Sequence, residues 1–149
     1  MVKLRDFVAG QEIYFIQAGR TVKDAVAIMT EKDIGALCVF QGDRLMGMFS
    51  ERDLMKRVIN KGLDIAKTSV DEVMTREITF ADAEENMASA LNKMKKYNCR
   101  HMPVIENNKL IGVVSLRKLL LHDVSVKEEE IRLLDAYITY SPLRMEENQ

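Results

Sequence analysis

The amino-acid sequence predicts an α+β fold in which two β-α-β-β-α units pack together as a pseudo-twofold pair. Residues 6–55 match residues 71–120 without a gap when the chain is shifted by 65 positions, and 14 of the 50 aligned positions are identical. The hydrophobic patterns that indicate helices and strands follow the same order in both copies. A unit of about 55 residues is marginal alone, whereas about 150 residues with a shared core bury a larger share of their surface. We therefore expect the two copies to pack against each other.

Each copy opens with a short extended segment, over residues 13–15 and 78–80. Helices follow from residues 22 and 87, because apolar residues then recur three and four positions apart. Thr21 and Asp24 give the first helix a capping-box start. Two apolar runs around a polar turn predict a β-hairpin, over 36–40 and 45–49 in the first copy and over 102–105 and 110–114 in the second. Ser50 and Ser115 open the closing helices, which are expected to end near residues 60 and 122.

The expected organisation has four parts: a first domain over residues 1–62, a linker over 63–70, a second domain over 71–125, and a C-terminal helix with a polar tail over 126–149. The last helix is expected over 126–140. Its apolar residues Ile131, Leu134 and Ile138 need a partner surface, supplied either by the module itself or by a second subunit. The polar end from residue 144 is expected to fray.

Composition excludes several classes of protein. The chain has 149 residues, of which 47% are hydrophobic and 30% are charged, as in a globular domain. Its net charge of -1 gives no general attraction to nucleic acid or to an anionic membrane. Neither a membrane-spanning run nor a signal peptide is recognised, so a cytoplasmic protein is expected. Cys38 and Cys99 are expected to be reduced and packed among apolar residues.

Catalytic patterns are missing from the sequence. The two histidines, His101 and His122, have no metal-ligand spacing, and the seven glycines form no phosphate-binding loop. The acidic runs 84–85 and 128–130 are expected to be solvated helix faces. We therefore expect no enzymatic activity, no metal and no catalytic cofactor.

A motif at the end of each hairpin points to a ligand. In the first copy it reads Gly47-x-x-Ser50-x-x-Asp53. A glycine lets a ligand ring approach the strand, a serine at a helix start suits a phosphate, and an aspartate one turn later accepts hydrogen bonds from a ribose diol. The same Ser-x-x-Asp pattern is also an ordinary capping box. Both interpretations stay open at this point.

The order of elements, this motif and the stretch Arg100–Ile105 before a turn resemble tandem cystathionine-β-synthase (CBS) domains, a pair often called a Bateman module. The resemblance covers about residues 6–122. It implies two pseudo-twofold clefts for adenosyl ligands such as AMP, ADP, ATP, NAD(H) or S-adenosylmethionine. It also implies flat, disk-like dimers that occur alone or regulate an attached enzyme or transporter.

The resemblance assigns residues to each cleft. In the first cleft Ser50 would contact phosphate or ribose and Asp53 the ribose diol, with the Met48 backbone and Ile78 against the adenine. Arg100 and His101 would face phosphates, although a surface arginine and a half-buried, hydrogen-bonded imidazole are the plain alternatives. The second cleft would be formed by a further six residues, which are Ile13, Gly35, Ala36, Val113, Ser115 and Lys118.

The second cleft departs from the pattern because Lys118 replaces the aspartate, and an ammonium group cannot accept a hydrogen bond. That cleft is empty, or uses Lys118 for an additional phosphate, or binds another ligand. We thus expect a stand-alone, non-catalytic homodimeric sensor that binds adenosine nucleotide in the first cleft and acts on an unidentified protein partner. The alternatives are a structural or interaction dimer with vestigial clefts, and a weak enzyme or redox-linked protein that holds a dinucleotide.

Overall fold

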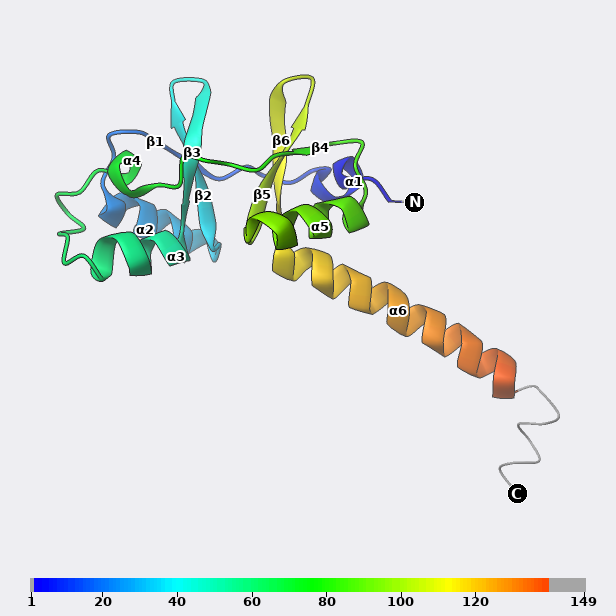
Figure 1. Ribbon diagram of the computed structural model, residues 1–149. Coiled ribbons are helices and arrows are strands. Elements are labelled where there is room, and N and C mark those ends of the chain that lie inside the picture. Colours follow the sequence, from blue (N-terminus) through cyan, green and yellow to red (C-terminus); the bar gives the residue numbers. More distant parts are fainter. Residues whose placement is uncertain (1, 140–149) are drawn as a thin grey trace.

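The protein forms two three-stranded sheets of the same topology, each packed against helices (Figure 1). The computed structural model describes residues 2–139. In both sheets the first strand runs parallel to the second, and the second pairs with the third as an antiparallel hairpin. The expected α+β pair of units is confirmed. Its strands are β1 (Phe15–Gln17), β2 (Ala36–Gln41), β3 (Arg44–Ser50), β4 (Ala81–Asp82), β5 (His101–Glu106) and β6 (Lys109–Ser115).

Irregular features repeat between the halves along with the regular ones. Helices α2 (Val22–Lys32) and α5 (Met87–Tyr97) end at Asp33 and Asn98, whose backbones are left-handed with φ of 53° and 50°. Aspartate and asparagine are among the few non-glycine residues that adopt this conformation readily. Both hairpins also shift register at equivalent positions, after Val39 and after Val104. The Thr21–Asp24 capping box is present at the start of α2, as predicted.

The first strand of each copy lies later than predicted. Strands were expected at 13–15 and 78–80, whereas β1 begins at Phe15 and β4 at Ala81. The ladder with the next strand starts only there, and Ile16 and Ala81 are the residues that enter the cores. Among the residues before these strands, Ile13 and residues 78–80 line cavities, which explains why an apolar pattern alone placed the strands too early.

The closing helices differ from each other. In the first half α3 (Glu51–Asp53) continues as the π-helix η1 (Leu54–Ile59), and the predicted span to about residue 60 is confirmed. In the second half α6 (Leu116–Thr139) is continuous, so the prediction of two separate helices is wrong. No glycine or proline interrupts residues 116–139, so nothing stops the helix. Tyr140, the side chain of Ile138 and the tail from 144 lie outside the description of the structure.

The two halves exchange short helices. Helix α1 (Leu4–Val8) contributes Leu4 and Val8 to the core of the second half, beside β6. Helix α4 (Val70–Val73) contributes Val70 and Val73 to the core of the first half. Each core is therefore completed by a segment from outside its own repeat copy.

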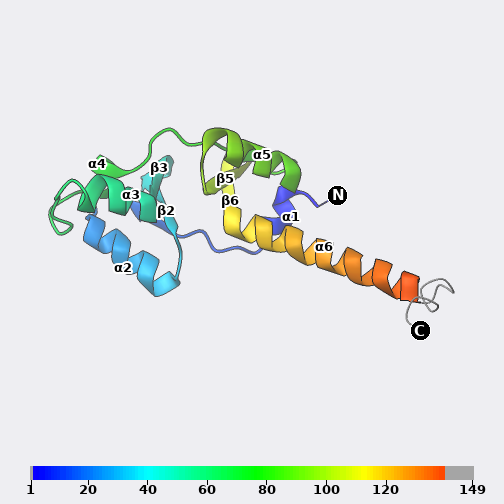
Figure 2. The same cartoon turned by 60° about the horizontal axis from the view of Figure 1, so that its bottom comes forward.

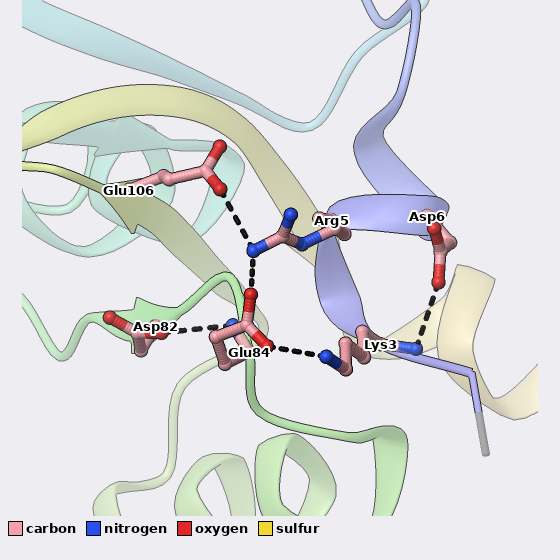
Figure 3. A network of polar contacts seen from close by, with 6 residues as sticks. All are labelled: Lys3, Arg5, Asp6, Asp82, Glu84 and Glu106. Atoms are coloured by element: carbon pink, nitrogen blue, oxygen red, sulfur yellow. Dashed lines mark hydrogen bonds and ion pairs between the residues drawn. The ribbon is translucent and has the colours of Figure 1, made fainter.

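Ion pairs hold α1 against the second half (Figure 3). Glu84 pairs with both Lys3 and Arg5, and Arg5 also lies 2.9 Å from Glu106. Glu84 and Glu85 lie just before α5, so the prediction that they form a helix face is wrong. Glu85 pairs with Lys93 of α5. Residues 128–130 do lie exposed on α6, as predicted. Exposed pairs contribute little each, so the buried apolar residues of α1 dominate its attachment.

Candidate functional site

A cavity of about 370 Å³ lies between the two halves. Its walls come from β3, α3, η1 and the start of β2 in the first half, and from residues 75, 77–79 and 97–101 of the chain that follows. This volume falls within the range of small-molecule sites, about 300–1,000 Å³. The structure brings together all six residues predicted for the first cleft, which are Met48, Ser50, Asp53, Ile78, Arg100 and His101.

Asp53 lies at the third position of α3 and is 6% exposed. Its Oδ2 accepts hydrogen bonds from the backbone N–H and the hydroxyl of Ser50, at 3.0 and 3.1 Å. The Ser50 hydroxyl in turn accepts from the N–H of Asp53 at 3.3 Å, which completes a capping box. The capping interpretation of this motif is therefore confirmed. Contact with a ribose diol stays a prediction.

The second oxygen of Asp53 is held by two residues that the sequence analysis missed. Oδ1 accepts from the hydroxyl of Thr75 at 3.0 Å and lies 3.4 Å from Nε of Arg57. The spacing of four positions between Asp53 and Arg57 on one helix was a signal for this pair. No local pattern signals Thr75, because it is 22 positions away in the chain.

The glycine of the motif makes room for the protein's own chain. A Cβ atom at Gly47 would lie 2.5 Å from the carbonyl oxygen of Thr75. The backbones of Met48 and Thr75 exchange two hydrogen bonds beside it, of 3.0 and 2.8 Å. The expectation that Gly47 gives a ligand access to the strand is therefore corrected, since a protein segment occupies that space. The Met48 N–H is also committed to this bridge.

His101 is half-buried on the wall of the cavity. Burial lowers the pKa of its imidazole below 6.5, the nearby Glu51 acts in the opposite direction, and Arg100 and Arg52 add to the lowering. Its ring lies close to Gly35, where an added Cβ would be 3.3 Å from Cε1 and Nε2. Arg100 is exposed at the rim. At neutral pH the permanent positive charge beside the cavity thus comes from arginine and lysine.

Charged side chains of both signs surround the cavity. Three basic residues of the first half, Arg52, Lys56 and Arg57, line it together with Arg100 of the second half. The acidic residues that line it are Glu51, Asp53 and Glu77. A cation set of this kind suits an anionic group such as a phosphate, because charge-assisted hydrogen bonds are stronger than neutral ones. Arg52 also donates to the carbonyl of Asn98 at 3.4 Å and so connects the two halves.

The second predicted cleft is built differently. The hydroxyl of Ser115 accepts from the N–H of Lys118 at 3.1 Å, which caps α6, and Lys118 is exposed. The side-chain amide of Gln11 bonds both the N–H and the carbonyl of Val113, at 2.7 and 3.0 Å. The protein's own amide therefore occupies the edge of β6.

The remaining residues predicted for the second cleft lie elsewhere. Ala36 lines the first cavity, and Gly35 packs on the ring of His101. Ile13 lines another cavity, of about 530 Å³, between the two hairpins. The structure thus divides the six residues among several environments and does not gather them as it gathers the first set.

A family model described as the CBS domain matches residues 4–60 and again residues 70–125. The chain belongs to the CBS-domain family. CBS-domain proteins are regulatory modules, so the repeat, the exchanged helices and the cavity between the halves belong to a fold with that general role.

Relatives cover most of this CBS pair. The mitochondrial CBS domain-containing protein CBSX3 of Arabidopsis thaliana is 35% identical over 123 residues, which are 79% of this chain and 60% of that protein. Hypoxic response protein 1 of Mycobacterium tuberculosis is 33% identical over 103 residues, covering 68% and 72%. A putative signal-transduction protein with CBS domains from Burkholderia ambifaria has a solved structure with a TM-score of 0.79, 28% identity and coverage of 83% and 95%.

The structure also bears on membrane-spanning helices, metal sites and the two cysteines. Within residues 2–139 of this CBS-domain protein, no helix is long and apolar enough to cross a membrane, and no cluster of three metal-ligating side chains occurs. Because one relative is named mitochondrial, the cytoplasmic location stays a prediction.

Cys38 and Cys99 are free thiols. Burial raises the pKa of the Cys38 thiol to about 12, so this thiol is unreactive at neutral pH.

Proposed function

We propose that the protein is a non-catalytic regulatory module whose first cavity binds an adenosine-containing ligand. AMP, ADP, ATP, NAD(H) and S-adenosylmethionine are the ligands considered. The observation that supports the proposal is the position of Asp53, which is a buried carboxylate at a helix start on the wall of a cavity between the two halves. A buried charge is costly unless it is well paired, so its presence at this point favours a specific role.

A ligand diol has to compete with groups of the protein for Asp53. Ser50 bonds Oδ2 as part of the helix cap, whereas Thr75 and Arg57 bond Oδ1. We expect the diol to replace the Thr75 hydroxyl, because one hydroxyl donor then substitutes for another. Arg57 is then free to turn towards a phosphate, together with Lys56 and Arg100.

Ligand binding in this cavity would change the contact between the halves. The cavity walls come from both halves, so a ligand that bridges them favours one packing over others, in proportion to its difference in affinity for the two states. We expect this change to be passed, in a homodimer, to a protein partner. A structural dimer with a vestigial cleft is the second candidate. The observation that favours it is that Asp53 is already bound by four donor groups from three residues, Ser50, Thr75 and Arg57.

Direct titration of the purified protein with ATP, AMP, NADH and S-adenosylmethionine tests the proposal. We expect at least one of them to bind and Asp53→Ala to weaken its binding by about 10 to 100-fold, because a hydrogen-bonded charged acceptor is lost. Asp24→Ala is the matched control. It removes the same kind of capping carboxylate from α2, away from the cavity, and should leave binding unchanged.

The outcomes separate the candidates. Binding that Asp53→Ala does not change would refute the assignment of that residue. If none of the four compounds binds, the structural dimer is the better account. Lys118→Ala should leave AMP binding unchanged and matter mainly for polyphosphates. Conversion of a bound compound to product, lost in His101→Ala, would support an enzyme instead.

A further inference from the structure

The C-terminal helix α6 carries an uncovered apolar stripe. Its first turns pack on the second half, and the rest extends away from the molecule (Figure 2). Leu120, Val124, Ile131 and Leu134 lie four, seven and three positions apart, which places them on one face of the helix. Ile131 and Leu134 are 65% and 62% exposed. Apolar side chains gathered in this way indicate a contact surface.

Charge limits what this stripe can contact. Residues 123–136 contain five acidic and two basic side chains, a net charge of -3. Glu128 and Glu130 precede Ile131 by three positions and one position, which places them on opposite sides of the stripe around the helix. Two such helices packed together would bring acidic flanks face to face, which is unfavourable. A basic surface with its own apolar centre is the better match.

The first half carries a surface of that kind on the outer face of η1 and the turn that follows. Met55 and Ile59 are 59% and 60% exposed, and Leu63 is exposed beside them in the chain. Residues 55–67 contain four basic side chains against the single acid Asp64, a net charge of +3. Lys56 and Arg57 also line the first cavity, whereas Lys61 and Lys67 are exposed outside it. This patch, like the α6 stripe, has exposed apolar side chains, and its net charge is opposite to that of α6.

We propose that α6 of one chain docks its apolar stripe on the η1 patch of a second copy. The helix cannot reach the patch of its own chain, because it leaves the molecule on the side of the second half and points away from α3 and η1 (Figures 1 and 2). A twofold pair forms this contact twice, each helix covering the patch of the other chain. Two such contacts are needed because stable interfaces bury about 800 Å² per partner, and a single helical stripe buries less than that.

Charge exchange in the full-length chain tests the proposal, with self-association followed by analytical ultracentrifugation at low salt. Ile131→Gln with Leu134→Gln should weaken association by about tenfold or more. Glu128→Lys with Glu130→Lys should also weaken it, and so should Lys61→Glu with Lys67→Glu. The chain with all four charge changes should regain association to within about threefold of wild type, because the attractive pairing is restored. All six positions changed here are exposed and none lines the first cavity. Circular dichroism checks that each variant is folded.

The contrary outcomes are distinct. If α6 pairs with α6, the lysine changes in α6 relieve repulsion and strengthen association, and the changes at 61 and 67 have no effect. If the chains associate through other surfaces, the glutamine changes have no effect. A wild-type chain that stays monomeric, or a fourfold variant as weak as its parents, also overturns the proposal. None of these readouts depends on a nucleotide, so the result is independent of the proposed ligand.

Discussion

At the start of the closing helix the first half holds Asp53, and the second half holds Lys118 at the equivalent position. A serine caps both helices, because the hydroxyls of Ser50 and Ser115 accept from the N–H groups three residues later. Only the first half adds a buried carboxylate to this cap. The serine therefore belongs to the shared scaffold, and the carboxylate is the feature by which the two halves differ chemically.

The segments that cross each sheet differ as well. In the first half the backbone of Thr75 bonds the backbone of Met48, and its hydroxyl also reaches Asp53. In the second half the side chain of Gln11 bonds the backbone of Val113. The same place is filled by backbone in one half and by an amide side chain in the other, so repetition of the sequence did not preserve the cavity wall.

The largest expected effect comes from the motif glycines. A Cβ at Gly47 would lie 2.5 Å from the backbone oxygen of Thr75, and one at Gly112 would lie 2.4 Å from Cβ of Val8. Gly47→Ala and Gly112→Ala should each cost about 1–3 kcal/mol of unfolding free energy in urea denaturation. Only Gly47→Ala should also weaken ligand binding, because it displaces a wall of the first cavity. Equal effects of both on binding would contradict the distinction between the halves.

Thr75→Val tests the hydroxyl that has no counterpart in the second half, where Gly10 is equivalent. The variant should lose about 1 kcal/mol of stability, since Asp53 loses one hydrogen bond. Ligand binding should survive, because the diol takes the acceptor position that the hydroxyl leaves. Stability is measured by urea denaturation and affinity by titration. A loss of affinity as large as that of Asp53→Ala would mean that Thr75 contacts the ligand itself.

Lys118→Asp restores the missing carboxylate in the second half. The new side chain completes a capping box with Ser115 at the start of α6 and should stabilise the protein by about 0.5–1 kcal/mol. It should not create an adenosine site, because Gln11 still occupies the edge of β6 at Val113. Thermal unfolding and titration with AMP measure the two effects. A second equivalent of bound AMP would show that Gln11 is no obstacle.

The smallest effect concerns His101, whose counterpart in the first half is Ala36. Burial lowers the pKa of His101 below 6.5 in the folded protein. The unfolded chain then binds the proton more readily, so stability is full above pH 6.5 and decreases as the pH falls below it. His101→Gln should reduce this decrease in denaturation experiments between about pH 5 and 8. An unchanged pH profile would contradict the assignment to His101.

Local patterns predicted much of the fold. Both hairpins and the helix caps at Thr21 and Ser50 follow from residues within a few positions of one another, and the repeat follows from matching the chain with itself at a shift of 65 positions. The six residues of the first cleft were found through a family resemblance that is itself based on such short motifs. Contacts between segments that are distant in the sequence could not be predicted. Thr75 meets Asp53 across 22 positions and Gln11 meets Val113 across 102, and no sequence period encodes either.

The exchange of α1 and α4 has a consequence for synthesis on the ribosome. Leu4 and Val8 leave the exit tunnel early, but the strands they cover are not complete until Ser115 has been made. The first sheet likewise waits for Val70 and Val73 before its core is closed. All buried residues of the first core lie between Ile16 and Met74, whereas the second core needs both Leu4 and Leu119. We therefore expect the first half to close soon after Met74 has emerged, and the second half to fold only when almost the whole repeat region has been made.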